Sequence, residues 1–361
     1  MTAYRGTSQL AAPQHGPRPL PLFLDMVRHE TAASPERMAR ALAGLARYQA
    51  APRDRPRRTM PARFRRRRAR LRDYGGAGPP VVLVPSLINS SAVLDLTAET
   101  SLARHVAARG FHAWLVDWGM PHPRDRAIDV TGHVADVLMP LLAKLPAPPI
   151  VIGYCLGGTM ALAAACRMPV AGLATIAAPW HFAGYGAAAR AEMAALWQAA
   201  RPGCEALGLV PMEVFQSGFW RLDPARTVAK YEAFAAMDDA RAPLFVALED
   251  WANGGAPLTL AAGAELFGRF IAEDLPGSGQ WRVAGAPVGP ALLDCPAVEF
   301  VSLTDRIVPA ATAAGLADRR DLRAGHVGMV VGGGARGQLW APLGDWLAAT
   351  ATSGRTARPA R

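Results

Sequence analysis

The sequence contains little cysteine, and its cysteines follow no pattern of a paired framework. No two of the four show Cys-x-x-Cys spacing, so we expect reduced thiols in a cytoplasmic protein. The first residues also lack a basic segment followed by an apolar core, and we therefore expect no secretory signal. The four cysteines are Cys155, Cys166, Cys204 and Cys295.

A long uninterrupted hydrophobic run is missing as well. The least charged long stretch, residues 145–166, opens with prolines and has glycines in its middle. This pattern is typical of a buried strand and helix rather than a membrane span. The 35 glycines and 31 prolines are spread along the chain, which argues against low-complexity or collagen-like structure. With 51% hydrophobic residues, the chain can bury a large core.

Lysine is scarce, and arginine supplies almost all of the positive charge. Between Arg53 and Asp73, eleven arginines stand against two aspartates, a local charge of +9 out of a net +10, which leaves +1 elsewhere. Such a run is most often a solvated, partly disordered linker. Binding of nucleic acid or of an anionic surface through Arg53–Arg72 remains an alternative. Because Phe64 is the only interleaved aromatic residue, base stacking is disfavoured.

Strands and helices alternate from about residue 80 onward. Short apolar runs such as "VVLV" are separated by helical patterns, which predicts an α/β fold with a mostly parallel sheet and helices on both faces. Before it, Ser34 and Pro35 mark the start of one helix. We predict an N-terminal helix and arginine-rich extension (1–73), an α/β core (74–181 and 291–352), a helical cap insertion (182–290) and a disordered tail (353–361).

The stretch "GYCLGG", Gly153–Gly158, lies between a predicted strand and a predicted helix. Glycine-x-nucleophile-x-glycine in this context is the form of a nucleophile elbow, which makes Cys155 the candidate nucleophile. The following helix begins at the cysteine, and its dipole lowers the pKa of a thiol there. The alternative is a small buried cysteine in a glycine-rich turn.

An elbow needs an acid and a base downstream, in that order. Asp305 follows the strand "AVEFVS", and His326 lies in the later loop "AGHVGMVV". The other histidines all precede the acid. A second oxyanion donor is expected in the loop "SLINSS", where Ser86 and Asn89 can alternatively cap a turn. Three rivals of Asp305 remain, namely Asp294, Asp318 and Asp321.

Together these motifs resemble the polyhydroxyalkanoate synthases, acyltransferases of the α/β-hydrolase fold that carry a cysteine in a lipase-like box. The resemblance depends on "VPSLINSSAVLDL", "GYCLGGT", "TDRIVP" and "GHVGMVVG", which occur here in this order. It implies that Cys155 is the nucleophile, that Asp305 and His326 form the acid–base pair, and that the amides of Leu156 and Ile88 are the oxyanion donors.

The resemblance implies polymerisation of (R)-3-hydroxyacyl-CoA with release of CoA, without metal or organic cofactor. It also implies a growing polyester as partner, a second synthase subunit or a homodimer, and a place in the cytoplasm or on polymer granules. In size the chain is closest to catalytic subunits of two-subunit synthases. The arginine run then offers electrostatic steering of CoA phosphates. A cysteine-nucleophile hydrolase, either a thioesterase or a polyester depolymerase, uses the same residues and remains the alternative.

Overall fold

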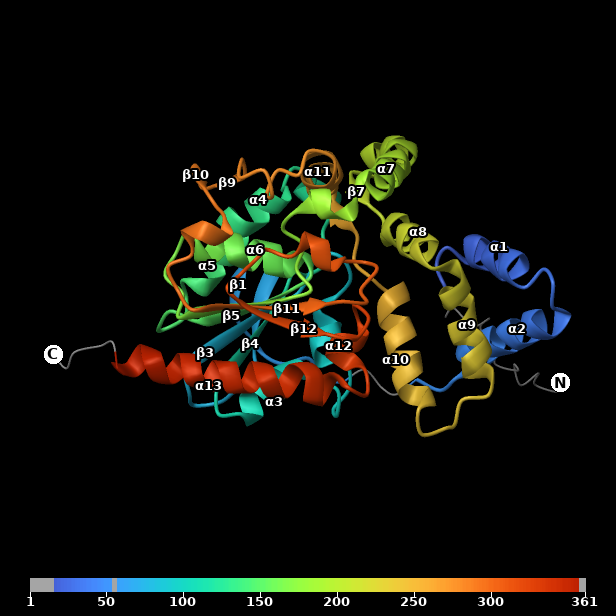
Figure 1. Ribbon diagram of the computed structural model, residues 1–361, viewed down its shortest axis with the longest axis horizontal. Helices are drawn as coiled ribbons and strands as arrows, with labels where there is room; N and C mark the ends of the chain where they lie inside the picture. Colours follow the sequence, from blue (N-terminus) through green and yellow to red (C-terminus); the bar gives the residue numbers. More distant parts are fainter. Residues whose placement is uncertain (1–15, 54–56, 357–361) are drawn as a thin grey trace, which may run out of the picture. The chain divides into compact units, whose positions relative to one another are not determined.

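The computed structural model describes residues 16–53 and 57–356 (Figure 1). The chain forms two compact units, each of which combines segments that are distant in the sequence. The smaller unit joins the N-terminal segment to Asp223–Asn253, and the larger unit contains Arg57–Leu222 and the chain from Gly254 onward. Residues 1–15, which include the segment expected to lack a secretory signal, lie outside the described residues.

The larger unit is built around an eight-stranded sheet with the order β1-β2-β4-β3-β5-β6-β11-β12. Strand β2 runs antiparallel to β1 and β4, and the strands from β4 to β12 run parallel. The predicted α/β fold with a mostly parallel sheet is therefore confirmed. The strands are β1 (Ala62–Arg66), β2 (Ala69–Asp73), β3 (Pro80–Val84), β4 (His112–Asp117), β5 (Ile150–Tyr154), β6 (Gly172–Ile176), β11 (Ala297–Ser302) and β12 (Asp318–Leu322).

Strands β3, β5 and β6 lie in the middle of this sheet and are buried at every position. Continuous apolar sequence suits them because helices cover both faces of a parallel sheet. In the register, Val84 at the end of β3 lies opposite Gly153 near the end of β5. The loops that follow these two neighbouring strands therefore leave the sheet at the same edge.

Helices cover both faces of the sheet, as Figure 1 shows with α4, α5 and α6 on one side and α3 and α13 on the other. Helix α3 begins after Ser101, whose hydroxyl accepts a hydrogen bond from the Arg104 amide at 3.1 Å. A π-helical stretch over His133–Leu138 joins α4 to α5. These helices are α3 (Leu102–Ala108), α4 (Val130–Gly132), α5 (Met139–Leu142), α6 (Leu156–Ala165) and α13 (Ala341–Thr356), and the short α12 (Gly328–Val331) follows β12.

The segments of the larger unit that lie between β6 and β11 are mainly helical. Their aromatic side chains pack face to face: Trp197 stacks on Phe267 with ring centroids 5.2 Å apart, and Phe215 on Phe267 at 5.6 Å. The elements are α7 (Ala187–Leu207), α8 (Met212–Leu222), α11 (Leu260–Ala264), a π-helical turn over Glu265–Ile271, and the short ladders β7 (Leu209–Val210) with β8 (Leu258–Thr259) and β9 (Arg282–Val283) with β10 (Ala286–Pro287).

The arginine-rich segment is not a linker in its described part, which corrects the prediction. Its residues form the β1–β2 hairpin at the edge of the sheet. Leu71 is fully buried, and Phe64 packs against Trp114 with ring centroids 5.6 Å apart. These few apolar side chains anchor the hairpin. Arg65, Arg66 and Arg67 are exposed, whereas Arg68 is largely buried.

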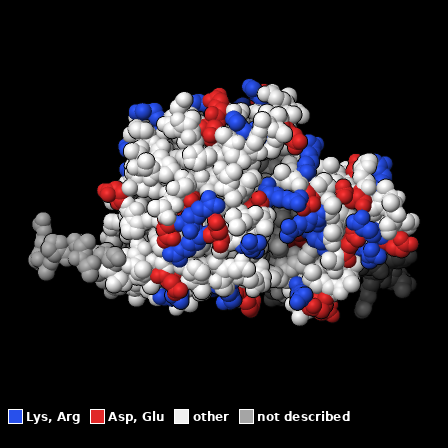
Figure 2. All heavy atoms as spheres, viewed as in Figure 1, with Lys and Arg blue, Asp and Glu red and all other residues white. Residues whose placement is uncertain are grey.

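Some arginines in and just before the hairpin pair with aspartates from elsewhere in the larger unit. Arg72 pairs with Asp117 at 2.6 Å, and Arg57 pairs with Asp95 at 3.3 Å. On the face shown in Figure 2, basic and acidic side chains are interspersed rather than gathered into one basic patch. The described part of the segment therefore gives little support to a nucleic-acid interface, which stays untested.

In its described residues the smaller unit consists of four helices. Helix α2 begins after Ser34, whose hydroxyl accepts from the Arg37 amide at 3.3 Å, as the sequence predicts. Helices α2 and α9 pack closely at Gly44, where an added Cβ would lie 1.9 Å from the carbonyl oxygen of Tyr231. The helices are α1 (Leu20–Glu30), α2 (Pro35–Ala50), α9 (Pro224–Ala235) and α10 (Ala242–Asn253).

This arrangement divides the chain differently from the predicted domains. Residues 223–253 do not belong with the rest of the expected cap insertion, 182–290, but with the N-terminal helices. Arg37 holds them there through a two-fold contact to Glu232, at 3.2 and 2.8 Å. The expected disordered tail is also shorter than predicted, because α13 continues through Thr356. Residues 357–361 lie outside the described residues.

Candidate active site

Cys155 lies at a sharp bend between β5 and α6. Its φ of 55° and ψ of −134° are strained for a residue with a side chain. Two backbone hydrogen bonds hold this conformation: the Cys155 amide donates to Ile176 of the neighbouring strand β6 at 2.9 Å, and Gly158 donates to the Cys155 carbonyl at 2.8 Å. The bend is the elbow that the sequence predicts, with the sulfur at its tip.

The glycines around Cys155 allow the strand and the helix to approach each other. A Cβ on Gly157 would lie 2.3 Å from the carbonyl oxygen of Val84, and a Cβ on Gly153 would lie 2.4 Å from the Cα of Gly158. Both distances are shorter than van der Waals contact, and backbone atoms cannot move aside as a flexible side chain can. The elbow therefore requires glycine at these positions.

We expect Gly157→Ala to lower the free energy of unfolding by about 1–3 kcal/mol, the usual cost of overpacking. Gly203→Ala is the control, because Gly203 lies in α7 with nothing within 4 Å of an added Cβ. That change should be neutral or stabilising by up to about 1 kcal/mol, through helix propensity. Urea unfolding of both variants measures the difference. Equal effects would contradict the packing account of the elbow.

Asp305 and His326 are joined by a short hydrogen bond. His326 Nδ1 lies 2.6 Å from Asp305 Oδ2, and both residues are buried. The other carboxylate oxygen, Oδ1, accepts from the amides of Ile307 and Val308 at 2.7 and 2.9 Å. These contacts fix the carboxylate, which in turn fixes the orientation of the imidazole.

The imidazole of His326 also makes a hydrogen bond with the Cys155 side chain. Since Nδ1 contacts Asp305, this bond falls to Nε2. Burial alone lowers the pKa of His326, but the charges of Asp305 and Cys155 and their hydrogen bonds raise it overall, to about 10. The imidazole thus lies between the Asp305 carboxylate and the Cys155 side chain, an arrangement that suits a nucleophilic cysteine with an adjacent base.

The raised pKa of His326 predicts a pH-dependent contribution to stability. A group whose pKa is higher in the folded state stabilises the fold fully below its unfolded pKa, here about 6.5. This contribution is lost as the pH rises through the folded value of about 10. The difference in unfolding free energy between wild type and His326→Gln should therefore shrink from pH 6.5 to pH 10. A difference that grows over this range would contradict the assignment.

The two predicted oxyanion donors differ in their present contacts. Leu156 is the first residue of α6, so its amide has no partner within the helix and points toward the elbow. The Ile88 amide, by contrast, donates to the hydroxyl of Ser86 at 3.0 Å. Ser86 thus caps the turn after β3, which was the alternative weighed for this loop. In this conformation Ile88 does not offer a free N–H.

The rival aspartates on β12 have surface roles. Asp318 pairs with Arg320 at 3.0 Å, and Asp321 pairs with Arg319 at 2.8 Å. Asp117 accepts from the Gly119 amide at 3.0 Å and supports its own loop. None of these carboxylates takes the place of Asp305 beside His326.

Two tyrosines near the elbow escaped the sequence reasoning. The ring of Tyr154 stacks on His326 with centroids 5.1 Å apart, and its hydroxyl donates to the His326 carbonyl at 3.2 Å. Burial, with the nearby Cys155 and Asp305, raises the pKa of the Tyr185 phenol, which stays neutral. Tyr154 lies in the quoted elbow motif, but no pattern marks Tyr185 in the sequence.

A family comparison agrees with this geometry. The model of the alpha/beta hydrolase family matches residues 81–333, which hold Cys155, Asp305 and His326. The chain belongs to the alpha/beta hydrolase family. In the described part of this α/β hydrolase, no group of three or more histidine, cysteine or acidic side chains is placed to hold a metal ion. No helix there is long and apolar enough to cross a membrane.

This α/β hydrolase is similar to poly(3-hydroxyalkanoate) polymerase subunits. It is 24% identical to subunit PhaC of Haloferax mediterranei over 298 residues, which cover 78% of this chain and 61% of that protein. It is 23% identical to subunit PhaC of Thiocystis violacea over 289 residues, 74% of this chain and 80% of that protein. The chain thus spans 61% of the length of the Haloferax relative. The resemblance inferred from the motifs is confirmed.

Proposed function

We propose that this protein is an acyltransferase that polymerises (R)-3-hydroxyacyl-CoA into a polyhydroxyalkanoate and releases CoA. The observation that carries the proposal is the Cys155 side chain at a strained bend, hydrogen-bonded to an imidazole that Asp305 holds. A thiol suits this reaction, because its attack on a CoA thioester exchanges one thioester for another.

The first step forms the acyl-enzyme. The Cys155 thiolate attacks the thioester carbonyl, and the amide of Leu156 stabilises the oxyanion. The bond to the CoA sulfur breaks, and His326 gives its proton to that sulfur as CoA leaves. Asp305 keeps the imidazole in the required tautomer.

The second step transfers the acyl group. His326 removes the proton from the hydroxyl of a 3-hydroxyacyl unit, and the resulting oxygen attacks the Cys155 thioester. An ester bond forms and the bond from carbon to Cys155 sulfur breaks, which restores the thiolate. A second oxyanion donor from the loop after β3 requires that the Ile88 amide first leave Ser86. Repetition lengthens the polyester, which places the protein at the surface of polymer granules.

Two features extend this proposal. The relatives are named as polymerase subunits, which supports a second synthase subunit as partner, with a homodimer as the other arrangement. Water must be kept from the acyl-enzyme for polymerisation to succeed. The helical insertion of the larger unit, α7, α8 and α11, is our candidate for that cover.

The product distinguishes polymerase from hydrolase. Purified protein given 3-hydroxybutyryl-CoA should release CoA and form an insoluble polyester, detected by turbidity and by chromatography after methanolysis. CoA release accompanied only by free 3-hydroxybutyrate would replace the proposal with a thioesterase. Cleavage of preformed polyester without CoA release would identify a depolymerase. A Cys155→Ala sample run in parallel corrects for spontaneous hydrolysis of the thioester.

A further inference from the structure

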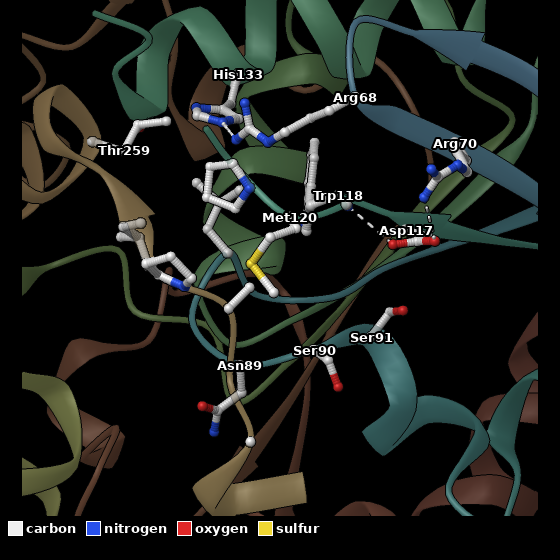
Figure 3. Close-up of a pocket in the computed structure, with 18 residues that line it drawn as sticks. Arg68, Arg70, Asn89, Ser90, Ser91, Asp117, Trp118, Met120, His133 and Thr259 are labelled. Carbon is white, nitrogen blue, oxygen red and sulfur yellow. Dashed lines mark hydrogen bonds and ion pairs between the residues drawn. The ribbon is translucent and has the colours of Figure 1, made fainter. Parts of the chain in front are cut away.

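A cavity in the larger unit lies beside the loop that follows β3. Its volume is about 240 Å³, just below the range of about 300–1,000 Å³ for sites that hold a whole drug-sized ligand. It therefore suits one end of a longer molecule. Five segments line it: the tip of the β1–β2 hairpin, the loops after β3 and β4, the π-helical stretch at His133, and residues 254–262 (Figure 3).

One wall of this cavity is cationic. Figure 3 shows Arg68 at the upper edge beside His133, and Arg70 at the side near Asp117. The Nη2 atom of Arg68 lies 2.6 Å from His133 Nε2. Its Nε atom is buried and has no hydrogen-bond partner among the residues that the structure describes. A buried donor without a partner is costly, which indicates that a ligand satisfies it.

The neighbours of Arg68 leave its charge unmatched. His133 Nδ1 lies 2.6 Å from the Asp129 carbonyl, so the Nδ1 hydrogen donates there and Nε2 is the acceptor that faces Arg68. Burial lowers the pKa of His133 to about 4, which keeps the ring neutral at physiological pH. The carboxylate nearest to Arg68 belongs to Asp125, at 3.8 Å, beyond hydrogen-bond distance.

The charge of Arg70 is likewise only partly balanced. Its contact with Asp117 is 3.5 Å long, whereas Arg72 occupies the same carboxylate oxygen at 2.6 Å. Arg68, Arg70 and Arg72 together face two carboxylates, those of Asp117 and Asp125. One positive charge is therefore in excess at this wall.

Much of the remaining lining is apolar. Trp118, Leu87 and Leu258 are buried there, and the Trp118 indole is fixed by donation to the Pro85 carbonyl at 3.0 Å. Met120, with 67% of its surface exposed, lies in the middle of the lining in Figure 3. A cavity lined by arginines and by apolar side chains suits a molecule with an anionic end and a less polar body.

We infer that Arg68 and Arg70 bind a phosphate group of a small molecule whose less polar part lies against Trp118 and Met120. Guanidinium groups match phosphate oxygens through paired hydrogen bonds. The loop after β3 that lines the cavity leaves the sheet beside the strand that ends at Cys155. Under the proposed function, on which this identification depends, the molecule is the CoA part of the thioester, with its phosphates far from the reacting sulfur.

Direct binding of free CoA tests the inference without requiring turnover. Isothermal titration calorimetry on the full chain should show CoA binding that Arg68→Gln weakens by about tenfold or more. Arg70→Gln should weaken CoA binding by a smaller factor. Because this variant keeps the Arg68–His133 contact, it still tests the inference if Arg68→Gln fails to fold. Arg65→Gln is the control, because it removes the same charge from an exposed position of β1 outside the cavity.

The outcomes separate this inference from the proposed function. The inference would be overturned if both cavity variants bound CoA as tightly as the wild type, or if Arg65→Gln lowered the affinity equally. Either result would hold even if Cys155 still forms an acyl-enzyme. Binding of inorganic pyrophosphate with the same dependence on Arg68 would support phosphate recognition. Binding of 3-hydroxybutyrate with that dependence, and none of CoA, would replace phosphate by a carboxylate and overturn the inference.

Discussion

Replacement of Cys155 by alanine is expected to abolish CoA release from a 3-hydroxyacyl-CoA, lowering kcat by at least about 10⁴-fold. The reason is that no other group at the elbow can carry the acyl chain between the two steps. The fold should be retained, since alanine removes one sulfur atom from a half-buried position. Release of CoA from 3-hydroxybutyryl-CoA, followed with a thiol reagent, measures the effect.

Cys295→Ala is the matched control for this experiment. Cys295 is also half-buried, but burial, with Cys166 and Asp294 nearby, raises the pKa of its thiol to about 11. It therefore stays protonated and unreactive at neutral pH. This variant should release CoA at the wild-type rate. Turnover that survives in Cys155→Ala and disappears in Cys295→Ala would show that Cys295, and not Cys155, is the nucleophile.

Asp305→Asn is expected to lower kcat by about 10³–10⁴-fold with little loss of stability. Asparagine keeps an oxygen that can accept from the amides of Ile307 and Val308. Its NH₂ group donates to Nδ1 of His326, which forces the hydrogen onto Nε2 and removes the base that faces Cys155. Steady-state kinetics, together with a thermal melt, separates the catalytic effect from unfolding.

Glu299→Gln supplies the opposite signature. Glu299 is a buried carboxylate on β11 that accepts from the amides of Leu316 and Ala314, at 2.9 and 3.0 Å. Replacement of this carboxylate by an amide should lower the free energy of unfolding by about 1–3 kcal/mol without changing the kcat of the folded protein. If both variants lost stability and activity to the same degree, Asp305 would be a structural residue rather than the partner of His326.

The places of Cys155, Asp305 and His326 in the fold were predictable because each follows a strand of a parallel sheet. Cys155 stands between a strand and a helix in a glycine-rich motif, and Asp305 and His326 follow later strands in the order that the fold requires. Local sequence determines these positions. The register of β3, β5 and β6 then brings the loops to one edge of the sheet.

The parts that sequence reasoning missed depend on contacts between distant residues. The β1–β2 hairpin has few apolar side chains. Arg72 in the hairpin pairs with Asp117, and Arg57 before it pairs with Asp95; the arginine run itself indicates neither partner. In the same way, α9 joins the N-terminal helices through Arg37 and Glu232, which are 195 positions apart. The Ile88 contact with Ser86 depends on the side-chain rotamer, which a motif does not specify.

The most direct test of the central claim is the intact mass of the protein after incubation with a saturated-chain analogue of 3-hydroxyacyl-CoA that lacks the acceptor hydroxyl. The account predicts a mass increase equal to one acyl group, located on Cys155 by peptide mapping and absent in Cys155→Ala. An unmodified Cys155 in protein that releases CoA, or an adduct on another residue, would contradict it.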